Sequence, residues 1–296
     1  MASNDQVDLF LSSIIDAPIK DQRDIMEFPH FALAKRARMD PMIYDDPKRG
    51  IHVEVRPGHK GIATIWDKDV MIYCSSLINE QIERGLTPAR TIQFHAYDFL
   101  RLARRGEGKR SYQLLQDALD RLQSTAIRTT IKTGEKEEKR FFSWIESARI
   151  VERKTPSGKD RMAAIEVTLN EWIFRALTKD RTVLTIDSRY FSLKGGVERR
   201  LYELARKHCG HQPRWDISLI NLWKKCGSQT DLRFFKVNLL KIIEADPLPS
   251  YSISASFDPK RKPGPPTDTH EVTRRYQKNE NMIISFRPKE GITVIE

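Results

Sequence analysis

Two amphipathic segments separated by a short turn constrain the fold more than any other feature of this sequence. Within residues 94–132, apolar residues first recur at helical spacing, at Phe99, Leu102 and Ala103. After the glycines at positions 106 and 108, helical spacing returns in a second segment, at Tyr112, Leu115, Leu119 and Leu122. Two helices joined by a short glycine turn form a helix-turn-helix.

A β-hairpin is expected directly after the second helix. Residues 126–131 are β-branched and rich in threonine, and after a turn residues 141–145 are again apolar. The segments 148–153 and 162–169 are expected to extend this hairpin with further strand. Because a helix-turn-helix followed by such a hairpin is a winged helix, we predict a winged-helix domain over residues 51–180.

The same pattern recurs later in the chain. Two further helices are expected over residues 218–227 and 231–245, and two further strands over residues 250–257 and 281–287. These elements predict a second winged-helix domain over residues 181–296.

The two helix pairs can be matched position by position. Leu102 and Gly106 have counterparts 121 residues later, in Trp223 and Gly227. The four apolar positions of the second helix have counterparts 120 residues later, at Leu232, Phe235, Leu239 and Ile242. The constant spacing indicates an internal repeat in which the second copy has one residue fewer in its turn.

The predicted fold class is therefore α+β, with two tandem winged-helix domains behind an N-terminal tail. Residues 1–50 are charged, rich in proline and aspartate, and without sustained periodicity. We expect most of this region to be a flexible tail.

The charge of the chain favours a polyanionic partner. The formal net charge is +11 and the pI is about 9.5. Anionic lipid is the rival to nucleic acid, but the sequence has no apolar run near the length of a membrane span and no secretory signal, so we expect no membrane association and a cytoplasmic protein.

Cysteine and histidine are too scattered to indicate a disulfide framework, a metal site or a cofactor. The chain has three cysteines, and the Cys209 and His211 fragment has no second ligand pair at zinc-finger spacing. The His-hydrophobic-His cluster of DNA-nicking initiators and the Walker phosphate loop are both missing from the sequence. We therefore predict a protein that is not an enzyme, with no catalytic residue, no metal and no cofactor.

The inward positions of each second helix determine which side chains could face DNA. In the first domain these are Lys109, Arg110, Gln113 and Gln116, and in the second domain Gln229, Thr230, Arg233 and Lys236. Residues near the N-terminus of such a helix reach base edges. Glutamine can pair with adenine and arginine with guanine, so Gln113, Gln116 and Arg233 are the candidate base readers.

Other cations are candidates for phosphate contacts. They are Lys109, Arg110 and Lys236 on the second helices, Lys224 and Lys225 on the helix before, and the Lys260-Arg261-Lys262 run in a proline-rich loop. For each cation the alternative is a solvated surface charge. For the first domain as a whole, the alternative is a winged helix that binds protein.

One element stands out within the expected tail. Gln6-Val7-Asp8-Leu9-Phe10 resembles the pentapeptide by which bacterial proteins dock on the sliding clamp of the replicative polymerase. In an extended segment, two adjacent apolar anchors can fill a preformed pocket while the glutamine bonds to its rim. The alternative is a tail that packs locally as a short helix.

Several short blocks together resemble the replication initiator protein A family of proteobacterial plasmids. They appear in the family order over about residues 28–288, at FPHF 28–31, GIATIWD 61–67, ALDRL 118–122, FSWI 142–145, VLTID 183–187, Leu201-Tyr202 and ARKH 205–208. The sequence departs from the family in its longer loop over residues 260–277.

This resemblance implies a plasmid replication initiator. Such a protein binds direct repeats in double-stranded origin DNA, helps to open the adjacent duplex, and recruits host machinery that includes the sliding clamp, the helicase and the host initiator protein. The C-terminal winged helix of similar initiators carries much of the base reading. Their N-terminal one contacts backbone and mediates a homodimer that represses its own gene. The alternative function is a winged-helix transcriptional repressor without initiator activity, because both functions use the same DNA-binding parts.

Overall fold

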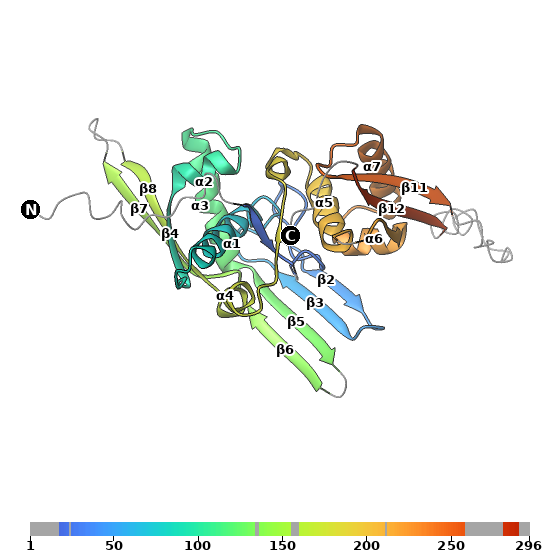
Figure 1. The fold of residues 1–296 in the computed structure, drawn as a ribbon, viewed down its shortest axis with the longest axis horizontal. Coiled ribbons are helices and arrows are strands. Elements are labelled where there is room, and N and C mark those ends of the chain that lie inside the picture. Colours follow the sequence, from blue (N-terminus) through green and yellow to red (C-terminus); the bar gives the residue numbers. More distant parts are fainter. Residues whose placement is uncertain are drawn as a thin grey trace, which may run out of the picture.

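The computed structural model describes residues 18–23, 25–133, 136–154, 160–210, 212–257 and 281–289. Figure 1 shows the first winged helix in cyan to yellow-green and the second in yellow to red. The first winged helix consists of α1 (Lys68–Glu83), β4 (Thr91–His95), α2 (Ala96–Leu102), α3 (Lys109–Ser124), β7 (Ile145–Lys154) and β8 (Asp160–Leu169). The second consists of α5 (Gly196–His208), β10 (Trp215–Ser218), α6 (Leu219–Cys226), α7 (Leu232–Ala245), β11 (Tyr251–Phe257) and β12 (Met282–Pro288).

The two copies share one topology, which confirms the predicted fold class. In each copy the strand before the helix-turn-helix pairs with the last strand of the hairpin that follows it. The sheet orders are β4-β8-β7 in the first copy and β10-β12-β11 in the second. Each three-stranded sheet and its helices therefore form a winged helix, and the wings are β7–β8 and β11–β12.

The hairpin that the sequence placed in the first wing belongs to another sheet. Strands β5 (Ala126–Thr133) and β6 (Lys136–Phe142) join β2 (Met42–Asp46) and β3 (Ile51–Arg56) in the order β2-β3-β5-β6. The prediction that this hairpin forms the wing was wrong. Strand β4 pairs along its length with β8, and β5 pairs with β3 instead. The first copy thus differs from the second by an inserted sheet.

The number of residues that separates the two copies of the first helix differs from the sequence prediction. Ala96, Phe99 and Ala103 are buried like the residues 123 positions later, Leu219, Leu222 and Cys226. The left-handed residue that ends each first helix follows the same offset, with Arg104 at φ 52° and Gly227 at φ 63°. The second helices keep the predicted offset of 120, since Leu115, Leu119 and Leu122 match Phe235, Leu239 and Ile242 in burial. The turn therefore differs by three residues, and Gly106 is not the counterpart of Gly227.

Within the described residues, the segment expected to be a flexible tail is folded. Strand β1 (Lys20–Gln22) pairs with β9 (Val183–Thr185), which lies between the two winged helices. Met26 and Phe31 are buried in the core, and β2 is an edge strand of the inserted sheet. The prediction of a flexible tail up to residue 50 is therefore wrong. The apolar residues of this segment are spaced too irregularly to show a period, but contacts with distant segments bury them. The boundary expected at residue 180 falls between α4 (Glu171–Thr178) and β9.

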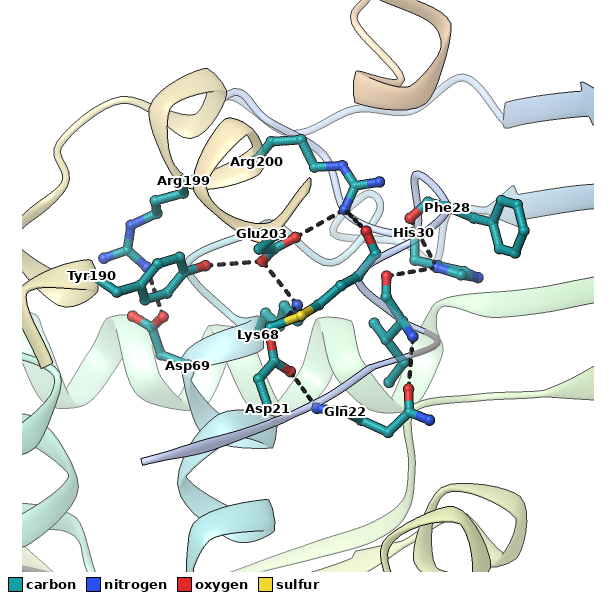
Figure 2. Close-up of polar contacts among 12 residues, drawn as sticks. Asp21, Gln22, Phe28, His30, Lys68, Asp69, Tyr190, Arg199, Arg200 and Glu203 are labelled. Carbon is teal, nitrogen blue, oxygen red and sulfur yellow. Dashed lines mark hydrogen bonds and ion pairs between the residues drawn. The ribbon is translucent and has the colours of Figure 1, made fainter. Parts of the chain in front are cut away.

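A buried ionic network joins the two winged helices. The Lys68 ammonium, at the start of α1, lies 2.6 Å from an Asp21 carboxylate oxygen and 2.8 Å from one of Glu203 on α5. The other Glu203 oxygen pairs with Arg200 at 3.0 Å. The hydroxyl of Tyr190, in the 3₁₀ helix η2 (Ser188–Ser192), donates to Glu203 at 3.0 Å. Figure 2 shows these side chains converging on one point between α1 and α5.

Burial and the neighbouring charges act in opposite directions on the pKa of each acid and base in this network. Burial alone would lower the pKa of Lys68, but the carboxylates of Asp21 and Glu203 raise it. Burial raises the pKa of Asp21 to about 6. Burial acts the same way on Glu203, but the charges of Lys68 and Arg200 outweigh it and lower the pKa of that carboxyl. Glu203 is therefore the principal counter-ion because it has two cationic partners.

No helix within the described residues is long and apolar enough to cross a membrane.

We expect Lys68→Met to lower the free energy of unfolding by about 3–5 kcal/mol, because Asp21 and Glu203 would keep buried charge without their shared cation. The matched control is Lys60→Met, which removes a surface ammonium that bridges two carboxylates on α3 and should cost about 1 kcal/mol or less. Urea unfolding followed by circular dichroism measures both changes. Equal losses for the two variants would show that the buried network does not hold the domains together.

Candidate nucleic-acid interface

The second helices of the two winged helices differ in how far neighbouring segments cover them. The predicted residues lie on α3, in the turn before α7 and on α7 itself, and the cations of the preceding helix lie on α6. The N-terminal residues of such a helix make base contacts and the preceding helix crosses the backbone in helix-turn-helix complexes. The exposure of each second helix at that end therefore decides what it could contact.

The predicted residues of α3 are open only in its first turns. Lys109, Arg110 and Gln113 are exposed, and Gln116 is partly buried. A hydrogen bond from Gln113 is one of the contacts that lower the pKa of Asp117, after the stronger bond from Lys60. These side chains could reach a phosphate or the edge of a base near the start of the helix.

The rest of the outward face of α3 is covered by the loop over residues 57–61. The Lys60 ammonium lies 2.9 Å from carboxylate oxygens of both Asp117 and Asp120. At the end of the helix, Gly58 packs so closely on Ser124 that a Cβ atom on the glycine would lie 2.2 Å from the serine hydroxyl. Because of this loop, only the N-terminal turns of α3 could enter a DNA groove, and the later turns could not.

A second contact fixes α3 against α1. Arg121 donates two hydrogen bonds to Asp67, from Nε at 2.7 Å and from Nη2 at 2.8 Å. Such a forked pair is strong and directional. Arg121 therefore holds α3 against the start of α1 and is not free to contact DNA.

The helix α7 is as open as α3 at its N-terminal end, and it stays open further along, because Val237 and Leu240 are exposed where their counterparts Asp117 and Asp120 are partly buried. Gln229, Thr230 and Arg233 are exposed, and Lys236 is partly buried. The turn before α7 is fixed by the indole of Trp223, which donates to the carbonyl of Thr230 at 2.8 Å. The predicted residues of the second domain thus lie at an accessible helix end.

Lys224 and Lys225 point in different directions, although the same phosphate contact was predicted for both. Lys224 is exposed, whereas the Lys225 side chain is only 13% exposed. The Lys225 ammonium lies 3.6 Å from a Glu27 carboxylate oxygen and 5.4 Å from the centre of the Phe28 ring. A phosphate contact does not fit this placement of Lys225.

Charge around Glu27 explains why Lys225 turns inward. Burial alone would raise the pKa of Glu27, but a hydrogen bond from Arg49 and the charges of Lys225 and Lys207 hold it at about 2. Burial in turn lowers the pKa of Lys225, and Glu27 partly offsets that effect. The pair therefore serves the packing of α6 against the N-terminal segment.

Two arginines that the sequence analysis missed hold the end of α6. Arg200 donates to the Lys225 carbonyl from Nε at 3.1 Å and from Nη2 at 2.9 Å, and Arg38 donates to the Gly227 carbonyl at 3.0 Å. Carbonyls at a helix C-terminus lack partners within the helix and attract cations. These contacts fix the turn before α7. No sequence signal could have found them, because Arg38 and Gly227 are 189 residues apart.

The other predicted residues lie outside the described part of the chain. They are Lys260, Arg261 and Lys262 of the basic loop, and Gln6, Val7, Asp8, Leu9 and Phe10 of the clamp-like segment. Among the described residues, no group of three or more His, Cys, Asp or Glu side chains is placed to hold a metal ion, and the three cysteines are buried free thiols.

Comparisons with known proteins agree with this architecture. The sequence profile of the replication initiator protein A family matches residues 20–253. A protein of Wigglesworthia glossinidia brevipalpis named "Putative replication protein" is 37% identical over 230 residues, which cover 77% of this chain and 82% of the relative.

Two kinds of solved structure share the fold. Domains 2 and 3 of RctB match with a TM-score of 0.62 at 14% identity, over 90% of this chain and 98% of that one. The Pi initiator protein, solved in complex with iteron DNA, matches with a TM-score of 0.50 at 18% identity, over 77% of this chain and 92% of that one.

Proposed function

The chain belongs to the replication initiator protein A family, and we propose on that premise that it initiates plasmid replication in the cytoplasm by binding direct repeats in double-stranded origin DNA. The observation that carries this proposal is the pair of winged helices, of which the second exposes Arg233 in the first turn of α7 and Thr230 and Gln229 in the turn before it. The Pi initiator protein, which has a similar fold, was solved with iteron DNA, and that supports a repeat-binding role.

The two domains have different tasks in this proposal. Arg233 reads guanine in the major groove, because its forked guanidinium matches the two acceptors of that base. The first turns of α3 contact the DNA backbone through Lys109 and Arg110, since the loop over residues 57–61 covers the remainder of that helix. Gln113 and Gln116 remain candidate readers at the open end of α3 only.

Recruitment of host factors completes the proposed function. The clamp-like segment over residues 6–10 docks on the host sliding clamp, and the DNA-bound protein brings the helicase and host initiator to the opened duplex. A homodimer formed through the first domain represses the protein's own gene. The proposed mechanism contains no covalent step on DNA, so the protein acts by binding and not as an enzyme.

Arg233→Ala should weaken binding to a cognate repeat by about 1–3 kcal/mol and relax the preference at one base pair, because it removes a bidentate contact to guanine. Fluorescence anisotropy on the repeat and on a scrambled duplex measures both effects. Arg84→Ala is the control, since Arg84 pairs with Glu80 on the surface of α1. An equal loss on the cognate and scrambled duplexes would refute base reading by Arg233.

Lys224→Ala should weaken binding to any duplex and reduce the slope of log K against log salt by about one unit, because one phosphate contact is lost. Lys225→Ala should leave the slope unchanged, because its ammonium is already engaged with Glu27. The neighbouring lysines thus serve as each other's controls in a salt titration. A reduced slope for Lys225→Ala would contradict the structural placement.

Leu9→Ala combined with Phe10→Ala should abolish or strongly reduce establishment of a plasmid that carries the cognate origin, while repeat binding in vitro stays unchanged. The two apolar anchors of the clamp-like segment are lost, whereas both winged helices are intact. Ser12→Ala with Ser13→Ala is the control pair. Normal plasmid establishment by the anchor variant would rule out the clamp contact, and failure of the wild-type chain to support replication would favour the repressor alternative.

A further inference from the structure

The outward face of α7 carries a row of exposed apolar side chains. Phe234 is 61% exposed, Val237 is 49% exposed and Leu240 is 41% exposed. They lie three residues apart, so they follow one another along one side of the helix. A contiguous exposed apolar row on a soluble protein usually marks a surface that a ligand or partner covers.

The winged-helix fold does not itself require this row. The counterparts of these residues on α3, at the offset of 120 shared by the second helices, are Leu114, Asp117 and Asp120. Two of the three counterparts are carboxylates held by Lys60. The same scaffold therefore accepts charge at these positions, and the apolar row of α7 needs a separate explanation.

The charges nearest the middle of the row are cations, which favour a polyanion that also offers apolar contact, while the exposed Asp231 and Glu244 lie at its two ends. Arg233 lies one helical turn before Val237, and the exposed Lys241 lies one turn after it. The Arg233 guanidinium carbon is 6.0 Å from the centre of the Phe234 ring, a cation–π distance that holds the arginine and the ring together. In the major groove of DNA, the 5-methyl group of thymine is the apolar group that a recognition helix can contact.

We propose that Phe234 and Val237 read thymine 5-methyl groups in the duplex that Arg233 contacts. This inference rests on the proposed function and names the base that its apolar residues recognise. The methyl group leaves water when it packs on the ring or on the valine, and the resulting hydrophobic gain is available only from thymine. Arg233 and the apolar pair would then read neighbouring bases in one groove.

The test compares thymine with deoxyuridine, which lacks only the methyl group. The full chain first selects its preferred duplex from a randomised pool, and each thymine of that duplex is then replaced in turn. We expect the wild-type affinity to fall about four-fold at one or more thymine positions, as anisotropy titrations measure it. Phe234→Ala and Val237→Ala should each abolish the distinction at one of these positions. Both residues are exposed, so the variants should keep the circular dichroism spectrum of the wild type.

The matched control is Leu114→Ala, at the position of α3 that corresponds to Phe234, which should keep the full distinction between thymine and deoxyuridine. If deoxyuridine binds as tightly as thymine at every position of a tightly bound duplex, the inference is overturned and the proposed function stands. If selection returns no preferred duplex, both are overturned. If the two variants keep the thymine distinction but lose self-association in sedimentation, the row joins two copies of the chain and the inference is overturned.

Discussion

Three consecutive charged residues at the start of α1 are buried, and each is paired with charged residues from distant parts of the chain. Asp67 receives the forked hydrogen bonds of Arg121 on α3, and Lys68 joins Asp21 to Glu203 on α5. Asp69 pairs with Arg199 on α5 at 2.6 Å and with Arg105 after α2 at 2.8 Å. A buried charge without its partner costs several kcal/mol, so the two winged helices can pack only where every pair closes.

This constraint has a consequence for DNA binding, because it places the two helix-turn-helix units relative to one another. The network continues through Arg200 to the end of α6, where the turn before α7 begins. The position of α7 is thus coupled to the first domain by side chains and not only by the linker. A rigid spacing between two such helices would suit the repeated DNA target that we propose, since half-site spacing follows the geometry of the protein.

Much of the internal repeat could be predicted from the sequence, and the parts that could not be predicted have a common physical reason. The inward residues of α3 and α7 were predicted correctly because their helical period is a local property of the sequence. The wing of the first domain was not predicted correctly. Two hairpins follow α3, and the sequence pattern alone does not show which of them pairs with β4. The two lysines at 224 and 225 look alike in the sequence, but only Lys224 is free to meet a phosphate, since Glu27 binds its neighbour.

By itself, the sequence determined the fold class, the family resemblance, the duplicated helix pairs and the residues that each helix buries. These follow from periodicity, turn residues and charge, which act over a few neighbouring positions. Only the tertiary structure decided which hairpin forms the wing, which helix face stays open and which cations are already paired. Those outcomes depend on contacts between distant positions, such as Lys60 with Asp117 across 57 residues and Lys225 with Glu27 across 198. Local pattern contains no information on pairs so far apart, whereas folding brings them into contact.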